Sequence, residues 1–406
     1  MTSPTIRTPS TPELVAMVAS FLALNALGID IMLPALPDIA AAYAVTVKAD
    51  EQLVLFVYLM SFGVAQLFYG PLSDSYGRRP VLLVSMVVYL MGTLLCLLAP
   101  TFEVFLLARA VQGASAAAAR VIAVAVVRDL MAGREMARVM SLAMMVFMVV
   151  PILAPGLGQL VLLAGPWQWI FGFLFAAGAI IMAWTWLRLP ETRPRDLRTP
   201  FDLGGALRSY GVVMRNRLAM GYTLAAAVAF GSLFGFLATA QPLFVDVFGL
   251  GVWFPLAFAT VAGVMSMASF INARFVTRFG MRRMSHAALT AFTALSAVHV
   301  LLLLAGPTPL WRYMLLLAPA MLMFGMIGAN FSAIAMEPLG ARAGVGSAFN
   351  GFATTTLSAL LGALIGRLYD GSPLPLIAGH LALGLGALAI VWVTERGRLF
   401  GTGPAG

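Results

Sequence analysis

The sequence predicts an all-α integral membrane protein with twelve transmembrane helices in two halves of six. Of its 406 residues, 61% are apolar and only 10% are charged, whereas a soluble domain carries roughly 25% charged residues. Long charge-free windows recur along the whole chain, and a helix needs roughly 20 apolar residues to cross a bilayer. This composition excludes a soluble enzyme, a disordered chain and a fibrous protein.

Ten of the twelve predicted spans lie in windows without a charged residue. Eight windows hold one helix each: 52–73, 81–102, 218–245, 247–273, 284–311, 313–336, 343–366 and 371–394. The window 139–187 is long enough for two helices, and Gly165 and Pro166 divide it. Two further spans, about 13–34 and about 103–127, contain charged residues and therefore bear on function.

A polar stretch separates the first six spans from the last six. We therefore expect an N-terminal six-helix half at 1–189, a cytoplasmic linker at 190–217 and a C-terminal six-helix half at 218–406. A weak internal repeat supports two halves, because the segments 70–79 and 273–283 both follow a span with glycine and paired arginines. Such repeats are common in secondary transporters.

The basic residues gather on one side of the predicted membrane. With the N-terminus inside, 20 of the 25 basic residues lie in cytoplasmic segments, 3 lie outside, and Arg109 and Arg120 lie within a span. The positive-inside rule then places both termini in the cytoplasm. Topology also accounts for the net charge of +9, so we expect no nucleic-acid partner.

Asp30 places a carboxyl group inside an apolar span. A charged side chain there costs roughly 2.5–3.5 kcal/mol on insertion scales, so it is a functional candidate. Burial favours the neutral form of a carboxyl group and a nearby arginine favours the charged form. Asp30 can therefore load and release a proton as its surroundings change. The alternative is a residue that snorkels to the outer interface, since Pro34 and Pro37 follow it.

Arg109 and Arg120 share one face of the fourth span. They are eleven residues apart, which at 100° per residue leaves them only about 20° out of alignment. Two guanidinium groups cannot face lipid cheaply, so we expect a water-filled cavity or partner groups. Arg109 lies roughly 12 Å from the outer end and Asp30 roughly 6 Å, so Arg109 is the expected partner of Asp30. Arg120 lies roughly 28 Å in, where it can pair with Asp129 or with a substrate.

Two short segments combine glycine with other residues that shape the backbone. The turn after the second span holds Gly70, Asp74, Gly77, Arg78 and Arg79, which predicts a latch between two helices on the cytoplasmic side. The fifth span holds Pro151, Pro155, Gly156 and Gly158. Prolines and glycines bend a helix and allow close approach, so this segment predicts a hinge.

The remaining polar and methionine side chains in the spans suggest a substrate cavity. Besides Arg120, the candidates are Asn25, Tyr58, Gln112, Met144, Met148 and Gln241. Interhelical hydrogen bonding or core packing is the alternative for each of them. The three histidines do not cluster, Cys96 is the single cysteine and no P-loop is present. We therefore expect no metal site, no disulfide and no ATP-driven transport.

Five segments resemble signatures of the major facilitator superfamily. GPLSDSYGRRP at 70–80 resembles its helix 2–3 signature, RAVQGASAA at 109–117 its helix 4 signature, and APGLGQ at 154–159 its helix 5 antiporter signature. IDIMLPALPDI at 29–39 and RVIAVAVVRD at 120–129 are similar to the bicyclomycin-resistance and chloramphenicol-efflux group of drug:proton antiporters.

The resemblance implies two six-helix bundles around a central cavity with alternating access. It implies export of small lipophilic drugs, such as chloramphenicol- or bicyclomycin-like compounds, in exchange for protons across the bacterial inner membrane. Asp30 would carry the proton and Arg109 would couple its protonation to shape. Asp129 would join the predicted latch, and Pro155 would belong to the hinge. The expected partners are drugs, protons and the lipid bilayer, with no cofactor and a monomeric chain.

Other functions remain open on sequence alone. An exporter of one endogenous metabolite would need more fixed polar groups in the spans than this chain has. A membrane enzyme would need clustered catalytic residues, and the pair Asp50 and Glu51 has no histidine beside it. A receptor would not explain an embedded carboxyl group with two arginines. We therefore expect a transporter rather than an enzyme.

Overall fold

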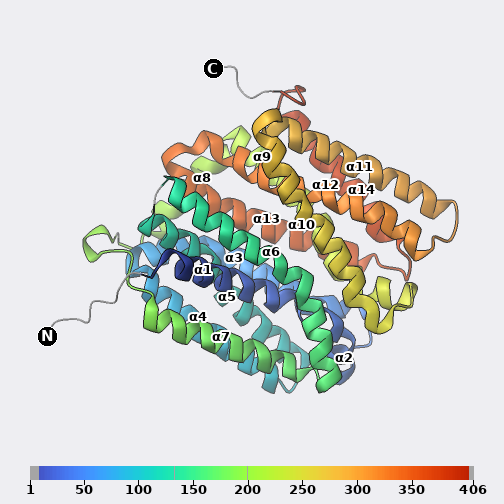
Figure 1. Cartoon of the computed structure of the whole chain (residues 1–406), viewed down its shortest axis with the longest axis horizontal. Helices are drawn as coiled ribbons and strands as arrows, with labels where there is room; N and C mark the ends of the chain where they lie inside the picture. Colours follow the sequence, from blue (N-terminus) through green and yellow to red (C-terminus); the bar gives the residue numbers. More distant parts are fainter. Residues whose placement is uncertain (1–8, 132, 199, 402–406) are drawn as a thin grey trace. The chain divides into compact units, whose positions relative to one another are not determined.

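The structure is a computed structural model that describes residues 9–131, 133–198 and 200–401. This part of the chain is built from helices and contains no strand (Figure 1). Twelve helices within it are long and apolar enough to cross a membrane, which confirms the predicted all-α fold with twelve spans. The predicted halves begin and end in residues 1–8 and 402–406, which lie outside the described residues.

The first compact unit comprises residues 1–206 and contains six of the twelve spans. Its helices are α1 (Thr11–Asp30), η1 (Leu33–Ala35), α2 (Leu36–Ala42), η2 (Lys48–Gln52), α3 (Leu53–Tyr76), α4 (Arg78–Leu98), α5 (Phe102–Leu130), α6 (Gly133–Ala164) and α7 (Gln168–Arg188). Helix α5 packs between α3 and α4, α1 packs against α6, and α4 lies beside α7 (Figure 1).

The second compact unit comprises residues 207–406 and contains the other six spans. Its helices are α9 (Arg217–Pro242), η4 (Leu243–Val247), η5 (Gly251–Trp253), α10 (Phe254–Phe279), α11 (Met281–Leu304), α12 (Leu310–Met336), η6 (Glu337–Arg342), α13 (Ala343–Arg367) and α14 (Leu374–Thr394). The closest pairs are α9 with α13 and α11 with α12.

The predicted linker contains two short helices, η3 (Arg195–Leu197) and α8 (Leu203–Arg215). Tyr210 on α8 is 7% exposed, and its ring lies 6.2 Å from that of Phe349 on α13. Helix α8 therefore packs on the second unit, and the division between the compact units falls inside the linker, after Ala206.

Local sequence explains where the helices begin and end. The side chains of Ser10, Thr101 and Asn216 each accept a hydrogen bond from a backbone N–H in the first turn that follows, and this capping favours a helix start. Gly77 (φ 100°) and Gly280 (φ 81°) separate successive spans in the left-handed region that favours glycine.

Several helices are longer than the predicted spans. Helix α5 runs on to Leu130 and α10 runs on to Phe279, so both include charged residues in their last turns. The windows mark the apolar core of a span, whereas a helix continues into the polar region where arginines are stable.

Close packing inside the first unit depends on small residues. A Cβ at Gly113 on α5 would lie 2.3 Å from the carbonyl oxygen of Tyr58 on α3. A hydrogen at this position therefore lets the two backbones approach, as small residues commonly do between membrane helices. This contact brings the face of α5 that carries Arg109 against α3.

Candidate functional site

Asp30 is the last residue of α1 and is only 6% exposed. Helix α1 ends there because Pro34 has no N–H to bond with the carbonyl oxygen of Asp30 four residues earlier. In the part of the chain that the structure describes, the Asp30 carboxyl group makes no hydrogen bond or ion pair. The side chain is thus buried and unpartnered rather than extended toward an interface.

Arg109 is fully buried and joins three helices of the first unit. Its Nη2 donates to the carbonyl oxygen of Gly28 on α1 at 3.0 Å, and its Nε donates to that of Val54 on α3 at 3.3 Å. Nη1 donates to Oε1 of Gln112 on its own helix. The guanidinium also lies 4.3 Å from the ring centre of Tyr58, a cation–π contact.

The predicted ion pair between Asp30 and Arg109 is absent from this structure, and that prediction is wrong for the state described. Arg109 reaches α1 only two residues before Asp30, but it bonds a backbone carbonyl there. All three guanidinium nitrogens donate to other acceptors, the carbonyl oxygens of Gly28 and Val54 and the side chain of Gln112. These contacts hold the guanidinium away from an ion pair with Asp30.

Three predicted cavity residues form a buried network with Arg109. The hydroxyl of Tyr58 donates to Oδ1 of Asn25 at 3.1 Å, and Nε2 of Gln112 donates to the hydroxyl of Thr93 at 2.8 Å. Tyr58 and Gln112 have no exposed surface. These side chains tie α1, α3, α4 and α5 together, so their contacts agree with the alternative of interhelical hydrogen bonding.

Arg120 differs from the other charged residues of the first unit. It is exposed, and its guanidinium lies 5.9 Å from the ring centre of Phe62 on α3. The proposed partner Asp129 is bound to Arg78 instead. Among the described residues Arg120 has no hydrogen bond or ion pair.

The other cavity candidates lie apart from this network. Met144 on α6 is 41% exposed, and Met148 is partly buried one turn further along the same helix. Gln241 is in the second compact unit, close to the end of α9, where it is 5% exposed and its Oε1 has no partner among the residues that the structure describes. Their assignment to a substrate cavity stays a prediction.

The predicted latch residues meet around a buried arginine. Arg78 is 1% exposed and forms ion pairs with Asp74 at 2.7 Å and with Asp129 at 3.0 Å. Its backbone N–H donates to Oε1 of Glu191 at 2.9 Å. A Cβ at Gly77 would lie 2.3 Å from the Glu191 carboxylate, so glycine leaves room for it.

Two other latch candidates contribute less to this network. Arg79 donates to the carbonyl oxygen of Trp186 at 2.6 Å, which ties the start of α4 to the end of α7. Gly70 has nothing within 4 Å of its Cβ position, so no close contact requires glycine there. The network therefore joins α3, α4, α5 and the segment after α7.

The second unit contains a matching network that the sequence analysis missed. Arg282, at the start of α11, pairs with Glu337 at 2.9 Å and with Glu395 at 2.9 Å. The Tyr222 hydroxyl donates to the same oxygen of Glu395 at 2.6 Å and lies 2.9 Å from Nε2 of His286.

The spacing along the chain could have revealed the second network. Arg78 and Glu191 are 113 residues apart, and so are Arg282 and Glu395. The repeat in the sequence marked the glycines and arginines, but the acidic partners come from distant helix ends. Once the structure gives the contact of Arg78 with Glu191, the same spacing in the second half points to Glu395.

The proline segment of α6 lies against the break after α1. Pro151 and Pro155 are inside a helix that is continuous from Gly133 to Ala164. A Cβ at Gly158 would lie 1.9 Å from the carbonyl oxygen of Ile31, directly after Asp30. The predicted hinge, which also includes Gly156, thus contacts the segment that holds the embedded carboxyl group.

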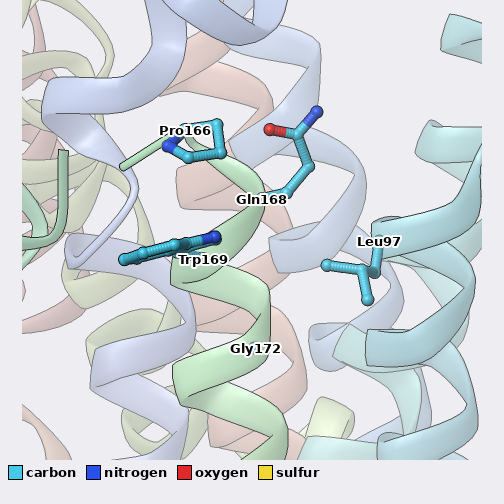
Figure 2. Close-up of a pocket in the computed structure, with 5 residues that line it drawn as sticks. All are labelled: Leu97, Pro166, Gln168, Trp169 and Gly172. Atoms are coloured by element: carbon cyan, nitrogen blue, oxygen red, sulfur yellow. The ribbon is translucent and has the colours of Figure 1, made fainter. Parts of the chain in front are cut away.

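A shallow apolar groove lies on the first unit away from these residues. Figure 2 shows the ring of Trp169 beside Pro166, with Leu97 projecting from the neighbouring helix α4; Gln168 and Gly172 complete the lining. Trp169 is 55% exposed, and tryptophans gather where membrane helices meet the interface. No predicted cavity residue lines this groove, so it is not the predicted substrate cavity.

Twelve spans in two units of six, with repeated networks and a buried carboxyl group inside a span, define a membrane transporter of the secondary type. The family model described as Major Facilitator Superfamily matches residues 18–363. The chain therefore belongs to the major facilitator superfamily.

Two curated bacterial relatives cover nearly the whole chain. A bicyclomycin resistance protein homolog of Haemophilus influenzae is 30% identical over 373 residues, which are 91% of this chain and 93% of that protein. The multidrug resistance protein MdtL of Salmonella paratyphi A is 31% identical over 347 residues, 84% of this chain and 85% of that protein.

A solved structure shows the same fold at low identity. The xylose transporter XylE from E. coli, in a partially occluded inward-open conformation, aligns with a TM-score of 0.72 at 10% identity. The alignment covers 94% of this chain and 96% of that one. The resemblance to the major facilitator superfamily and its fold is thereby confirmed, and the chain is a multi-pass membrane protein.

Proposed function

We propose that this protein exports small lipophilic drugs across the bacterial inner membrane in exchange for protons, by alternating access. The names of the two curated relatives, bicyclomycin resistance and multidrug resistance, support drugs as the cargo. The proposed proton coupling rests on one observation: among the described residues, the carboxyl group of Asp30 at the end of α1 is buried without a counter-ion.

The proposed role of Asp30 follows from its surroundings. A carboxyl group in an apolar interior is stable when it holds its proton, and loss of the proton leaves a charge that needs water or a cation. Asp30 lies between two tight contacts of α1, Arg109 to Gly28 on one side and Gly158 to Ile31 on the other. A change in its charge therefore acts on the segment that α5 and α6 hold in place.

In the proposed cycle, Asp30 takes up a proton from outside and releases it to the cytoplasm while a drug moves outward. The two ion-pair networks around Arg78 and Arg282 are proposed to stabilise one closed state from within each bundle. The proton gradient supplies the energy, with no cofactor, and one chain is proposed to suffice.

The test is drug-dependent proton movement in liposomes that contain the purified protein. With a pH gradient imposed, we expect chloramphenicol, bicyclomycin or a lipophilic cation to trigger proton flux through the wild type. Asp30→Asn removes the titratable proton but keeps nearly the same shape, so it should abolish this flux. Asp38→Asn is the matched control, since Asp38 is exposed on α2 of the same span.

Two results would count against the proposal. Unchanged flux in folded Asp30→Asn protein would exclude Asp30 as the proton carrier. Absence of flux with every drug in folded wild type would contradict drug efflux, and screening of cell extracts would then test export of a single metabolite.

A further inference from the structure

Arg120 is a cation inside a span, and among the described residues it has no hydrogen-bond or ion-pair partner. It is exposed on α5 and contacts the ring of Phe62 at 5.9 Å. Throughout the ranges that the structure describes, no acceptor is hydrogen-bonded to it and no carboxylate pairs with it. Arg109, on nearly the same face of α5, is by contrast fully buried and bound to backbone carbonyls.

The position of Arg120 along α5 makes this isolation costly. The helix has 29 residues and is therefore about 43 Å long. Arg120 is about 6 Å from the midpoint of the helix and about 27 Å from its start at Phe102, close to the depth expected from the sequence. A charge at this depth is stable only where it faces water or a ligand of opposite charge.

The chain itself offers few carboxylates that could neutralise Arg120. Of its acidic residues, only Asp30 lies near the middle of a span, at the break inside Thr11–Ala42, where it is buried; the others stand near the ends of spans or between them. Asp129, next to the last residue of α5, is held by Arg78. Glu337 and Glu395 are held by Arg282. An anion from outside the protein is therefore the counter-ion that this site lacks.

The exposed side of α5 also indicates what such an anion carries. Arg120, Val124 and Arg128 are exposed at successive turns, so a path of one apolar and two cationic side chains leads from mid-span to the end of α5. A guanidinium binds a carboxylate through two parallel hydrogen bonds. The side chain of Val124, 37% exposed one turn further along α5, supplies apolar surface for the rest of the molecule.

We propose that Arg120 binds the anionic group of the transported compound, so that the preferred substrates are small organic acids with an aromatic or alkyl body, above all carboxylates. This inference rests on the proposed export function and sets its order of preference, because lipophilic acids should be exported in preference to the neutral drugs and the lipophilic cation of the liposome test. It also separates the two tasks, because the proton binds at Asp30 and the anionic substrate binds at Arg120.

The test compares ligands that differ only in charge, without any gradient. The purified protein in a non-ionic detergent is titrated by calorimetry with 1-naphthoate and with the uncharged 1-naphthamide. We expect the wild type to bind the carboxylate about tenfold tighter or more, the difference expected for hydrogen bonds to a charged group. Arg120→Gln should remove this preference, and Arg120→Lys should keep part of it.

The matched control is Arg278→Gln. Arg278 is also exposed and lies 5.4 Å from a phenylalanine ring, that of Phe279, but it stands in the last turn of α10. Its loss lowers the net charge by the same amount and should leave naphthoate binding unchanged. Equal weakening by both variants would mean that only the overall charge attracts the ligand, which would overturn the proposal.

Other outcomes also overturn it. Equal binding of naphthoate and naphthamide by the wild type, or full naphthoate preference in Arg120→Gln, excludes Arg120 as the anion site. Anionic lipid headgroups share the chemistry of the ligand, so the titration is repeated in nanodiscs with and without phosphatidylglycerol. Loss of naphthoate binding when this lipid is present would assign Arg120 to lipid instead of substrate.

Failure of the export function would look different. Asp30→Asn should bind naphthoate as the wild type does while losing proton flux. If the wild type binds naphthoate through Arg120 but shows no proton flux with any compound, proton-coupled export is excluded and the anion site remains.

Discussion

Arg109 and Arg120 illustrate how one helix face can hold two cations in opposite ways. Arg109 has no exposed surface and uses its donors on the backbone of α1 and α3, whereas Arg120 is exposed beside a phenylalanine ring. The planar guanidinium offers several donors in a fixed fork. That geometry lets Arg109 join three helices, and it leaves Arg120 able to receive a carboxylate.

Arg109→Lys should destabilise the first unit even though the charge is kept. An ammonium group cannot reach the Gly28 carbonyl, the Val54 carbonyl and Gln112 together. We expect a loss of about 1–3 kcal/mol in the free energy of unfolding for an acceptor left unsatisfied, together with loss of drug-dependent proton flux. Thermal and denaturant unfolding in detergent measure the first effect.

Arg312→Lys serves as the control for that experiment. Arg312 lies 5.4 Å from the Trp311 ring near the start of α12 and is exposed, so its replacement should change stability by less than about 0.5 kcal/mol. Stability of Arg109→Lys equal to that of the control would show that the carbonyl contacts of Arg109 contribute little.

The sequence could identify these side chains but not their partners. An embedded aspartate and two arginines stand out in any apolar span, since each is costly there. The partners of Arg109 are backbone carbonyls of Gly28 and Val54, and every residue has a carbonyl, so no residue type marks them. This is why the Asp30–Arg109 ion pair was expected and the carbonyl contacts were not.

At the scale of helices, the contact of α6 with the end of α1 depends on one missing methyl group. The Ile31 carbonyl follows the break in the first span and points toward Gly158. Pro151 and Pro155 precede this point on α6 and leave the helix continuous. The sequence thus predicts that this part of α6 is a hinge, but it does not show which helix the hinge contacts.

Gly158→Ala should separate α6 from the first span. The new Cβ would lie 1.9 Å from the Ile31 carbonyl oxygen, so a backbone must move, and overpacking of this kind costs about 1–3 kcal/mol. We expect lower thermal stability and slower proton flux in liposomes, because the displaced segment carries Asp30.

Gly263→Ala provides the comparison for this substitution. Gly263 lies within α10 and has nothing within 4 Å of its Cβ position, so alanine there should be neutral or slightly stabilising through its better helix propensity. Equal behaviour of the two alanine variants would mean that α6 does not need close contact with Ile31.

At the scale of the whole molecule, the two units repeat one ion-pair plan. Each has a glycine with positive φ shortly before a buried arginine. The backbone N–H of Arg78 donates to Glu191 and the guanidinium of Arg282 donates to Glu395, in each case 113 residues later. The twelve spans and the halves followed from apolar windows and turn residues, which are local signals. The networks join residues from separate helix ends. The one sequence feature that the two networks share is the equal spacing of 113 residues between the arginine and the glutamate.

The orientation of the whole chain is predicted from its loops and can be measured directly. Cys96 is the single cysteine and is fully buried, so an introduced cysteine gives the only strong signal with an impermeant maleimide. Asp196→Cys lies in the linker and Ala305→Cys lies after α11, both at exposed positions that leave the basic residues unchanged. Because 20 basic residues lie on the linker side and 3 on the other, the linker should face the cytoplasm.

In spheroplasts we expect Ala305→Cys to react at once and Asp196→Cys to react only after permeabilisation, with the unsubstituted protein unlabelled throughout. The reverse order would place the linker outside, invert the proposed directions of proton and drug movement, and show that the loop arginines do not set the topology.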